Sequence, residues 1–479
     1  MRHVDDAASL SRRDFVVGVA SGFAAASLAP AAAGEAAAAD RGGPYDVIVI
    51  GGGFAGVTAA REASLRGLET LLLEARPRLG GRTFTARLAG HDVDLGGAWL
   101  GWSQPHVWSE IQRYGVGIVE GAAAGATRAI WMDDGQRVEG DPAAYGALME
   151  SMVAAFYGPA RDAFPRPYDP LFRQGFEALD AMSAAEAIER LSLPAVQKDL
   201  ALSFAAINGH SFPDQSSYLD QLRWFALGNF SFGNLWDNLG RYRVQGGMKA
   251  LLDRMQADSQ ATLKVASPVA AVKQEGGRVT VRTRGGDAYS ARAAIVATPL
   301  NCLADIEFSP ALSPTKLAVS RARHTGSGTK LYARVRGRHP VFSGQGTVRM
   351  PLNFLWTEYD DPDSQLLVGF GPSPDLLDVN DDEAVQLALR DYVPDVELIE
   401  TFSYDWNRDP FARGTWCMYR PGVLTRDLVE LQRSEGHVHF AGSDIANGWR
   451  GFVDGAIESG ARVAQQVVRQ LTGTAGPAP

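Results

Sequence analysis

A glycine-rich turn between two short apolar segments constrains the fold of this chain more than any other feature. Tyr45–Ile50 is a β-branched run typical of a buried parallel strand, and it leads directly into the sequence G-G-G-F-A-G at residues 51–56. A helical segment at Val57–Leu65 and a second apolar strand at Thr70–Leu73 follow, and Glu74 ends the unit. This order predicts an α/β fold with a Rossmann-like dinucleotide-binding domain.

Each part of this unit has a physical role in holding a dinucleotide. Gly51 permits the tight turn, Gly53 lets the backbone approach a pyrophosphate, and Gly56 lets the helix pack closely on the strand. The unpaired N–H groups at the helix N-terminus then face the phosphates. Glu74, 18 residues after Gly56, is placed to accept hydrogen bonds from ribose hydroxyls, and its charge disfavours the 2′-phosphate of NADP.

Two further segments indicate which dinucleotide is bound. A basic, glycine-rich turn at residues 76–83 comes shortly after Glu74, and it suits FAD, which stays bound and needs more contacts than NAD. Residues 94–101 form another glycine-containing segment, where backbone can pass close to a planar group. For Arg78 and Arg82 the alternative is a solvated loop charge.

These segments resemble the flavin-containing monoamine oxidase family, and the similarity spans about residues 44–470. It continues at residues 243–248, 267–269, 279–281 and 294–299, and its most specific part lies at 440–444 and 447–460. Within the family, four stretches resemble bacterial nicotine oxidoreductase-like amine oxidases: 104–108, 164–167, 404–406 and 409–411. With the glycine turn, the resemblance assigns FAD binding to Gly51, Gly53, Phe54, Ala55, Gly56, Glu74, Ala75, Arg76, Gly81, Arg82, Gly97, Ala98, Trp99, Val269, Gly442, Ser443, Asp444, Phe452 and Val453.

The C-terminal segment adds a second helix N-terminus to the expected cofactor site. A strand at residues 437–440 ends in a small-residue turn, and helical periodicity runs from Phe452 to Leu471. The positive end of this helix near the flavin carbonyl edge would stabilise the reduced, anionic flavin. The family pattern places Asp444 on the ribityl chain, where relatives more often carry Glu.

The N-terminal glycine-rich unit and the FAD-type segment that begins at residue 243 are far apart in the sequence, which implies a discontinuous FAD-binding domain. Helical segments are expected at Ala143–Tyr157, Ser183–Leu191 and Asp214–Ala226, with a capping box at Ser183 and Glu186. Strands are expected at Thr329–Val335 and Gln365–Gly369, and a helix at Asp382–Asp391. We therefore predict an FAD-binding domain at 44–122, 239–301 and 415–471, an α+β substrate domain at 123–238 and 302–414, and a tail at 472–479.

The resemblance places three residues at the reacting centre. Lys330 matches the family lysine that holds a water at flavin N5, and its alternative is a lysine at a strand edge. Trp416 and Phe452 match the two walls of an aromatic cage that flanks the amine, where aromatic faces favour the nitrogen and restrict its approach. Trp356, Trp224 and Phe225 are further pocket candidates, with core packing as the alternative for each.

Two departures from the family pattern refine these expectations. Relatives with covalent flavin carry Cys immediately before the first cage residue, where this chain has Thr415; Cys417 lies one position past the cage residue. We therefore predict non-covalent FAD. The nicotine enzymes carry a polar residue where Phe452 stands, which disfavours nicotine itself as the substrate.

The expected activity is that of an FAD-dependent amine oxidase. A hydride would pass from the carbon next to an amine nitrogen to flavin N5, the imine would hydrolyse, and O₂ would reoxidise the flavin and yield H₂O₂. One alternative is a periplasmic amine dehydrogenase that passes electrons to a carrier protein. A weaker alternative is an L-amino-acid oxidase with Arg450 as the carboxylate partner. The third alternative is a catalytically silent flavoprotein that only binds a partner.

Residues 1–40 predict an export signal and linker rather than folded structure. Arg12 and Arg13 precede a mildly apolar, Ala/Gly-rich run with A-x-A-like cleavage points, which is typical of a Tat signal; a disordered N-terminus is the alternative. A periplasmic or secreted protein without a transmembrane anchor is therefore expected, and a homodimer is possible. The net charge of −9 disfavours nucleic acid as a partner, and two cysteines exclude a disulfide framework. His437 and His439 lack a third ligand, so no metal site is expected.

Overall fold

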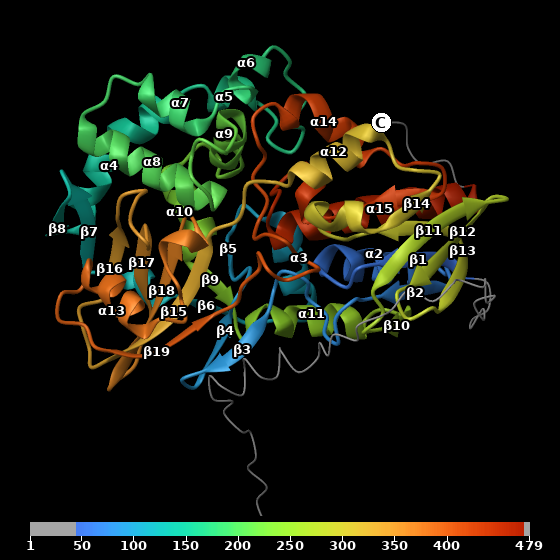
Figure 1. Cartoon of the computed structure of the whole chain (residues 1–479), viewed down its shortest axis with the longest axis horizontal. Coiled ribbons are helices and arrows are strands. Elements are labelled where there is room, and N and C mark those ends of the chain that lie inside the picture. The colour runs from blue at the N-terminus through green and yellow to red at the C-terminus, as the bar shows by residue number, and fades with distance from the viewer. Residues whose placement is uncertain (1–44, 474–479) are drawn as a thin grey trace, which may run out of the picture.

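The structure, a computed structural model, describes residues 45–473. The predicted export signal at 1–40 and residues 474–479 of the predicted tail lie outside this range. Two large sheets occupy opposite ends of the molecule, and helices pack around each of them (Figure 1). Within the described range, no helix is long and apolar enough to cross a membrane.

The first sheet contains the predicted βαβ unit at its centre. β1 (Tyr45–Ile50) pairs in parallel with β2 (Thr70–Leu73) on one side and with β13 (Ala288–Val296) on the other. The last four residues of β1 are fully buried, as its continuous apolar sequence predicts. The sheet is completed by β10 (Thr262–Lys264), β11 (Val269–Glu275), β12 (Arg278–Thr283), β14 (Glu307–Ser309) and β20 (Val438–Phe440).

Two long helices lie against one another beside this sheet. α2 (Phe54–Ser64) follows the glycine turn, and α15 (Val453–Thr472) crosses it at Gly460, where a Cβ atom would lie 2.3 Å from the carbonyl oxygen of Ala55. α3 (Pro105–Tyr114) and α11 (Gly247–Ala257) pack on the same core. Small residues at these crossings therefore bring the backbones into close contact.

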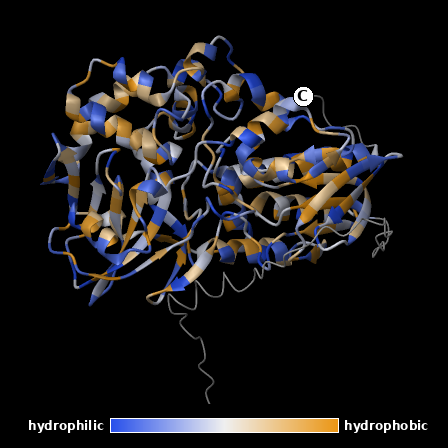
Figure 2. Cartoon of the chain, viewed as in Figure 1, coloured by the Kyte–Doolittle hydropathy of each residue, from blue (hydrophilic) through white to orange (hydrophobic). Residues whose placement is uncertain are grey.

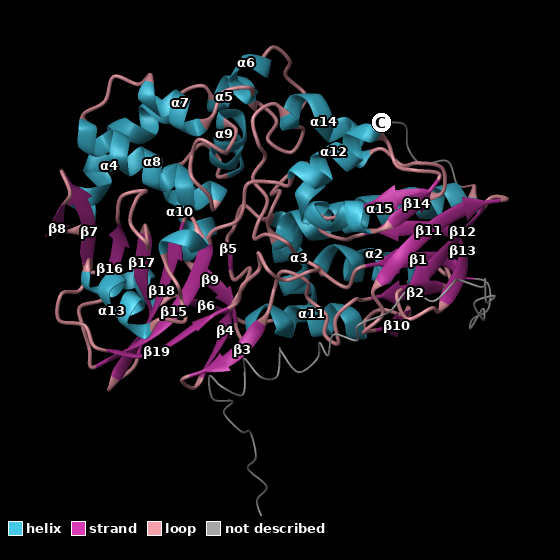
Figure 3. Ribbon diagram, in the orientation of Figure 1, coloured by secondary structure: helices cyan, strands magenta, loops and turns pink. Residues whose placement is uncertain are grey.

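The second sheet has the strand order β19-β15-β18-β17-β16-β7-β8. In Figure 3 its strands lie at the left, beneath the helices labelled α4 to α10, with α13 (Asp382–Arg390) nearby. The strands are β7 (Arg128–Asp133), β8 (Gln136–Gly140), β15 (Thr329–Arg336), β16 (Phe342–Gln345), β17 (Phe354–Asp360), β18 (Ser364–Gly371) and β19 (Leu398–Ser403). The covering helices are α4 (Pro142–Phe156), α5 (Ala160–Ala163), α6 (Glu177–Asp180), α7 (Ala184–Glu189), α8 (Ala195–Gly209), α9 (Tyr218–Leu227) and α10 (Phe232–Gly240).

Short elements join the half of the molecule that contains the first sheet to the half that contains the second sheet. β3 (Thr85–Leu88) pairs with β4 (His91–Asp94), and β9 (Tyr242–Val244) lies between β5 (Trp99–Leu100) and β6 (Ile118–Glu120). α12 (Pro314–Ala322) and α14 (Val423–Gln432) pack together. Many strand residues in both sheets are apolar (Figure 2), and they contribute to the buried cores.

The local predictions succeed where capping and periodicity are strong. The capping box at Ser183 and Glu186 is present, and a helix occupies most of each expected range. α9 begins at Tyr218 rather than Asp214, because the Ser217 side chain caps it. The β7–β8 hairpin was missed in a region expected to be largely helical, because β7 is fixed by parallel pairing with β16, more than 200 residues later. The predicted domain boundaries stay a prediction, and β14 joins the first sheet although it lies past residue 301.

Replacing Gly56 by alanine tests the closest backbone contact of this fold. A Cβ atom at this position would lie 1.8 Å from the carbonyl oxygen of Gly51, so helix and strand would have to separate. We expect Gly56→Ala to lower the free energy of unfolding by about 3 kcal/mol or more and to reduce flavin content. The matched control is Gly146→Ala in α4, where nothing lies within 4 Å of the added carbon; it should stabilise the protein by about 1 kcal/mol. Equal urea denaturation midpoints for the two variants would contradict this account.

Candidate active site

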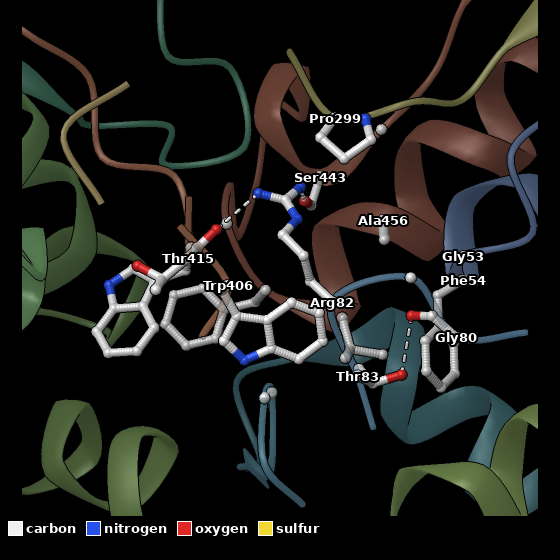
Figure 4. A pocket seen from close by; sticks show the side chains of 18 of the residues that line it. Gly53, Phe54, Gly80, Arg82, Thr83, Pro299, Trp406, Thr415, Ser443 and Ala456 are labelled. Atoms are coloured by element: carbon white, nitrogen blue, oxygen red, sulfur yellow. Dashed lines mark hydrogen bonds between the residues drawn. The ribbon is translucent and has the colours of Figure 1, made fainter. Parts of the chain in front are cut away.

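A cavity of about 430 Å³ lies between the two sheets and brings together most of the predicted site residues (Figure 4). Its lining runs from the glycine turn after β1 to strands β15, β17 and β18 of the second sheet. The predicted residues that line it are Gly51, Gly53, Phe54, Ala55, Glu74, Ala75, Arg76, Gly81, Arg82, Gly97, Ala98, Trp99, Trp224, Val269, Lys330, Trp356, Trp416, Gly442, Ser443, Phe452 and Val453. Gly56, Phe225 and Asp444 do not line it.

Two helix N-termini open onto this cavity without side-chain caps. α2 starts after Gly53 and α15 starts after Phe452, and neither of these residues has a side chain that accepts a hydrogen bond from the helix N–H groups. Phe54 and Ala55 of α2 and Val453 of α15 line the cavity wall. Since the first N–H groups of a helix need acceptors, these ends suit an anionic or electron-rich ligand.

Glu74 closes the glycine turn and faces the cavity. Its carboxylate accepts hydrogen bonds from the backbone N–H of Gly52 at 2.6 Å and of Arg76 at 2.8 Å. Arg76 in turn pairs with Asp409 at 2.6 Å. The acidic residue is therefore held in place at the end of β2 by the turn itself, in the position predicted for a ribose partner.

Arg82 connects the cavity wall to the C-terminal segment. Its guanidinium donates to the carbonyl oxygen of Thr415 at 2.9 Å (dashed in Figure 4), to the Ser443 hydroxyl at 2.9 Å and to Asp444 at 2.6 Å. Asp444 also accepts from the backbone N–H of Leu300, and the neighbouring Arg82 charge lowers its pKa despite burial. Asp444 therefore holds Arg82 and does not line the cavity, and its expected contact with the ribityl chain stays a prediction.

The far end of the cavity is aromatic. Trp224 meets Phe452 edge-to-face with ring centroids 4.8 Å apart, and Trp356 stacks on Phe370 at 5.3 Å. Phe370 also contacts Trp416, with centroids 6.0 Å apart. Phe225 was expected in this pocket, but its ring stacks on Tyr157 at 4.4 Å and belongs to the helical core.

Lys330 lies in this aromatic end and is buried. Its Nζ donates to the carbonyl oxygens of Asp94 at 2.6 Å and Gly96 at 2.8 Å, and it lies 4.3 Å from the centroid of the Trp99 ring. Burial lowers the pKa of Lys330 to about 7. The two carbonyls occupy two of the three N–H groups of the protonated amine, which leaves one for a ligand or water in the cavity.

Sequence reasoning missed several residues of the aromatic end. Phe370 is the direct cross-strand partner of Lys330 in the β15–β18 pairing, so correct strand register would have found it. Asn208 and His210, at the end of α8, also line the cavity. No local signal marks either of them, because they reach the site only through the packing of α8 against the second sheet.

Comparison with known proteins identifies the family of this fold and site. A family model described as flavin containing amine oxidoreductase matches residues 54–468. The chain belongs to this family. The flavin amine oxidoreductase is 42% identical to a pseudooxynicotine dehydrogenase from a Pseudomonas species over 482 residues, 97% of each chain. It is 38% identical to a nicotine dehydrogenase from Pseudomonas putida over 433 residues, 89% of each chain.

A solved structure of a redesigned putrescine oxidase shares the fold of the flavin amine oxidoreductase. The TM-score is 0.79 at 23% identity, and the match covers 89% of this chain and 99% of that chain. The monoamine oxidase-like architecture predicted from the sequence is thereby confirmed.

The cavity fits the FAD that this family uses. The glycine turn, two uncapped helix N-termini, Glu74, Arg82 and Val269 all line this cavity. The FAD is bound without a covalent link, as predicted. Thr415 stands before Trp416, and the Cys417 thiol is fully buried, lies outside the cavity lining and has its pKa raised by burial.

A buried ionic cluster supports the two sides of the aromatic end. Asp220 on α9 pairs with Arg223 at 2.9 Å and with Arg450, and all three side chains have no exposed surface. Trp224 follows Arg223 on the same helix, while Arg450 precedes Phe452 by two residues. The guanidinium of Arg450 lies 3.8 Å over the Tyr419 ring and does not line the cavity, so it is not placed to bind a substrate carboxylate.

Asp220→Asn tests this cluster. The two guanidinium groups lower the pKa of Asp220 to about 2, so its charge stabilises the native state above the unfolded pKa near 3.9. Removing the charge leaves two buried cations uncompensated, and we expect the free energy of unfolding to fall by about 3 kcal/mol at pH 7. The difference in the free energy of unfolding between wild type and variant should be about 1 kcal/mol smaller at pH 3 than at pH 7. The stabilisation by the Asp220 charge is lost as the pH falls toward the pKa of Asp220 in the folded protein.

Urea unfolding of both proteins at the two pH values measures this difference. Asp253→Asn, at an exposed pair with Lys249, is the control and should leave stability nearly unchanged. A difference that is constant between pH 7 and pH 3 would show that Asp220 does not act through its charge.

Proposed function

We propose that this flavin amine oxidoreductase oxidises a small, largely apolar amine that carries an aromatic ring. A hydride leaves the carbon next to the nitrogen, the product is an imine or iminium, and its hydrolysis gives the carbonyl compound. Bound FAD supplies the hydride acceptor. One observation carries the proposal: Lys330, Trp416 and Phe452 line the same cavity as the glycine turn and the two helix N-termini.

The residues of the aromatic end have separate tasks in this proposal. Trp416 and Phe452 present apolar faces that hold a neutral amine and restrict its approach, which favours one orientation of the reacting carbon. Lys330, fixed by two backbone carbonyls, uses its remaining N–H to hold a water at the reacting centre. Trp224, Trp356 and Phe370 extend the apolar surface toward the rest of the substrate.

The aromatic part of the substrate is supported by the cavity and by the relatives. The far end of the cavity is built from tryptophan and phenylalanine rings, which suit a planar ring by offset or edge-to-face contact. The two relatives described above are named for pseudooxynicotine and nicotine, both of which carry a pyridine ring and an amine. An amino-acid substrate has less support, because Arg450, the expected partner of its carboxylate, is buried and paired with Asp220.

The electron acceptor and the location are further parts of the proposal. O₂ as acceptor yields H₂O₂, whereas the name dehydrogenase carried by both relatives favours transfer to an electron carrier protein as a second candidate. The twin arginines at residues 12 and 13 support Tat export to the periplasm or medium.

The visible spectrum of the purified protein tests the proposed function. Aliphatic, aromatic and pyridine-bearing amines, nicotine and amino acids are each added anaerobically. We expect the amines that carry an aromatic ring to bleach the oxidised flavin band. Admission of air afterwards separates the acceptors, because an oxidase regains its colour quickly and a dehydrogenase requires a carrier or dye. A yellow protein that no amine bleaches would refute amine oxidation by this site.

Lys330→Met tests the role of the buried lysine. Methionine keeps the apolar stem but cannot hold a water, so we expect the rate of anaerobic flavin reduction, or of reoxidation, to fall about 100-fold. FAD content should stay unchanged, since both hydrogen bonds of the Lys330 side chain go to backbone carbonyls, at residues 94 and 96, and methionine can keep the contact with the Trp99 ring. Lys249→Met, at an exposed lysine, is the matched control. Stopped-flow rates equal to wild type in both half-reactions would exclude the proposed role.

A further inference from the structure

His210 stands out among the residues that line the cavity. It ends α8 in the left-handed conformation, with φ of 46°, which a residue other than glycine rarely adopts. Its side chain is buried, and burial lowers its pKa to about 3. A strained, neutral and buried histidine beside a reacting centre calls for a physical reason.

The imidazole of His210 lies flat against one face of the Trp416 indole. The two rings are parallel within 6°, and their centroids are 3.9 Å apart. The indole N–H of Trp416 donates to the carbonyl oxygen of Asn208 at 2.8 Å. The end of α8 therefore fixes both the plane of the indole and its rotation within that plane.

Two hydrogen bonds define the tautomer of His210. Nε2 lies 3.1 Å from the carbonyl oxygen of Thr329, which can only accept, so Nε2 carries the proton. Nδ1 is consequently the acceptor, and the Thr415 hydroxyl donates to it at 2.8 Å. Thr415 immediately precedes Trp416, and Thr329 immediately precedes Lys330.

The backbone around His210 is built to keep this arrangement. The N–H groups of Ser327 and Gly328 both donate to the His210 carbonyl oxygen, at 2.8 and 2.7 Å. A Cβ atom at Gly328 would lie 2.4 Å from the imidazole, so only glycine allows the ring to pack here. These contacts hold the left-handed conformation in place.

We propose that His210 is a positioning residue that sets the plane of Trp416 and links it to the strand that bears Lys330. The imidazole stacked on the indole supports one wall of the amine site, and its two hydrogen bonds fix the distance between Thr415 and Thr329, the chain neighbours of Trp416 and Lys330. This inference rests on the proposed amine oxidation, because Trp416 is there a wall of the reacting site.

Two variants separate the parts of this link. His210→Phe keeps an aromatic ring for stacking and removes both hydrogen bonds, while Thr415→Val removes only the hydroxyl that donates to Nδ1. We expect each to raise the dissociation constant of a tertiary-alkyl amine, which binds but has no hydrogen on the carbon next to nitrogen, by about tenfold in a flavin difference titration. The rate of flavin reduction by the amine that bleaches wild type should fall by a similar factor.

A double-mutant cycle with Trp416→Ala decides whether the effect passes through the indole. If it does, His210→Phe or Thr415→Val has little further effect once the indole is gone. Additive losses in the cycle, or unchanged dissociation constants in both single variants, would overturn the proposal. If the His210→Phe protein does not bind FAD, the same measurements on Thr415→Val alone test the proposal.

The controls distinguish this proposal from the proposed function. His91→Phe changes a histidine that stacks on Tyr359 at 3.8 Å outside the cavity lining, and it should leave binding and reduction unchanged. A wild-type protein that no amine reduces refutes the proposed function, whereas a wild type that is reduced and variants that behave like it refute only the role of His210.

Discussion

The close approach of α2 to its neighbours is the constraint on which the rest of the structure depends. Gly56 lets the helix lie against the turn at Gly51, and Gly460 of α15 lets the second helix cross it at Ala55. Because both helices start beside the cavity, these crossings aim two uncapped N-termini at the same ligand. An added methyl group at either crossing would move the helix, and with it a wall of the site.

A chain of hydrogen bonds joins the half of the molecule that contains the first sheet to the half that contains the second sheet. Arg82 donates to the Thr415 carbonyl, the Thr415 hydroxyl donates to His210, and His210 donates to the Thr329 carbonyl. The chain thus runs from Arg82 in the first half to β15 of the second sheet. Together with the buried cluster around Asp220, it explains how segments distant in sequence meet in one aromatic site without a metal or a disulfide in the described residues.

The sequence allowed prediction of those parts of the site that local motifs encode. The spacing of the glycine turn and Glu74 reflects a backbone requirement, whereas the family resemblance indicated Lys330, Trp416 and Phe452. Gly51 and Gly53 of the turn, Glu74 and these three residues line the cavity. What could not be predicted depends on tertiary packing. His210 is an isolated histidine at a helix end, and the β7–β8 hairpin depends on a distant partner. Asp444 pairs with Arg82 and Phe225 stacks on Tyr157, and neither residue lines the cavity.

Thr415 illustrates what this connectivity means for change during evolution. Its carbonyl oxygen serves Arg82, and its hydroxyl serves His210, so one residue bears on flavin contacts and on the amine wall at once. The family resemblance places a cysteine at this position in relatives with covalently bound flavin. A lineage that exchanged threonine for cysteine here would therefore alter substrate choice together with cofactor attachment, and the two traits would be inherited as one.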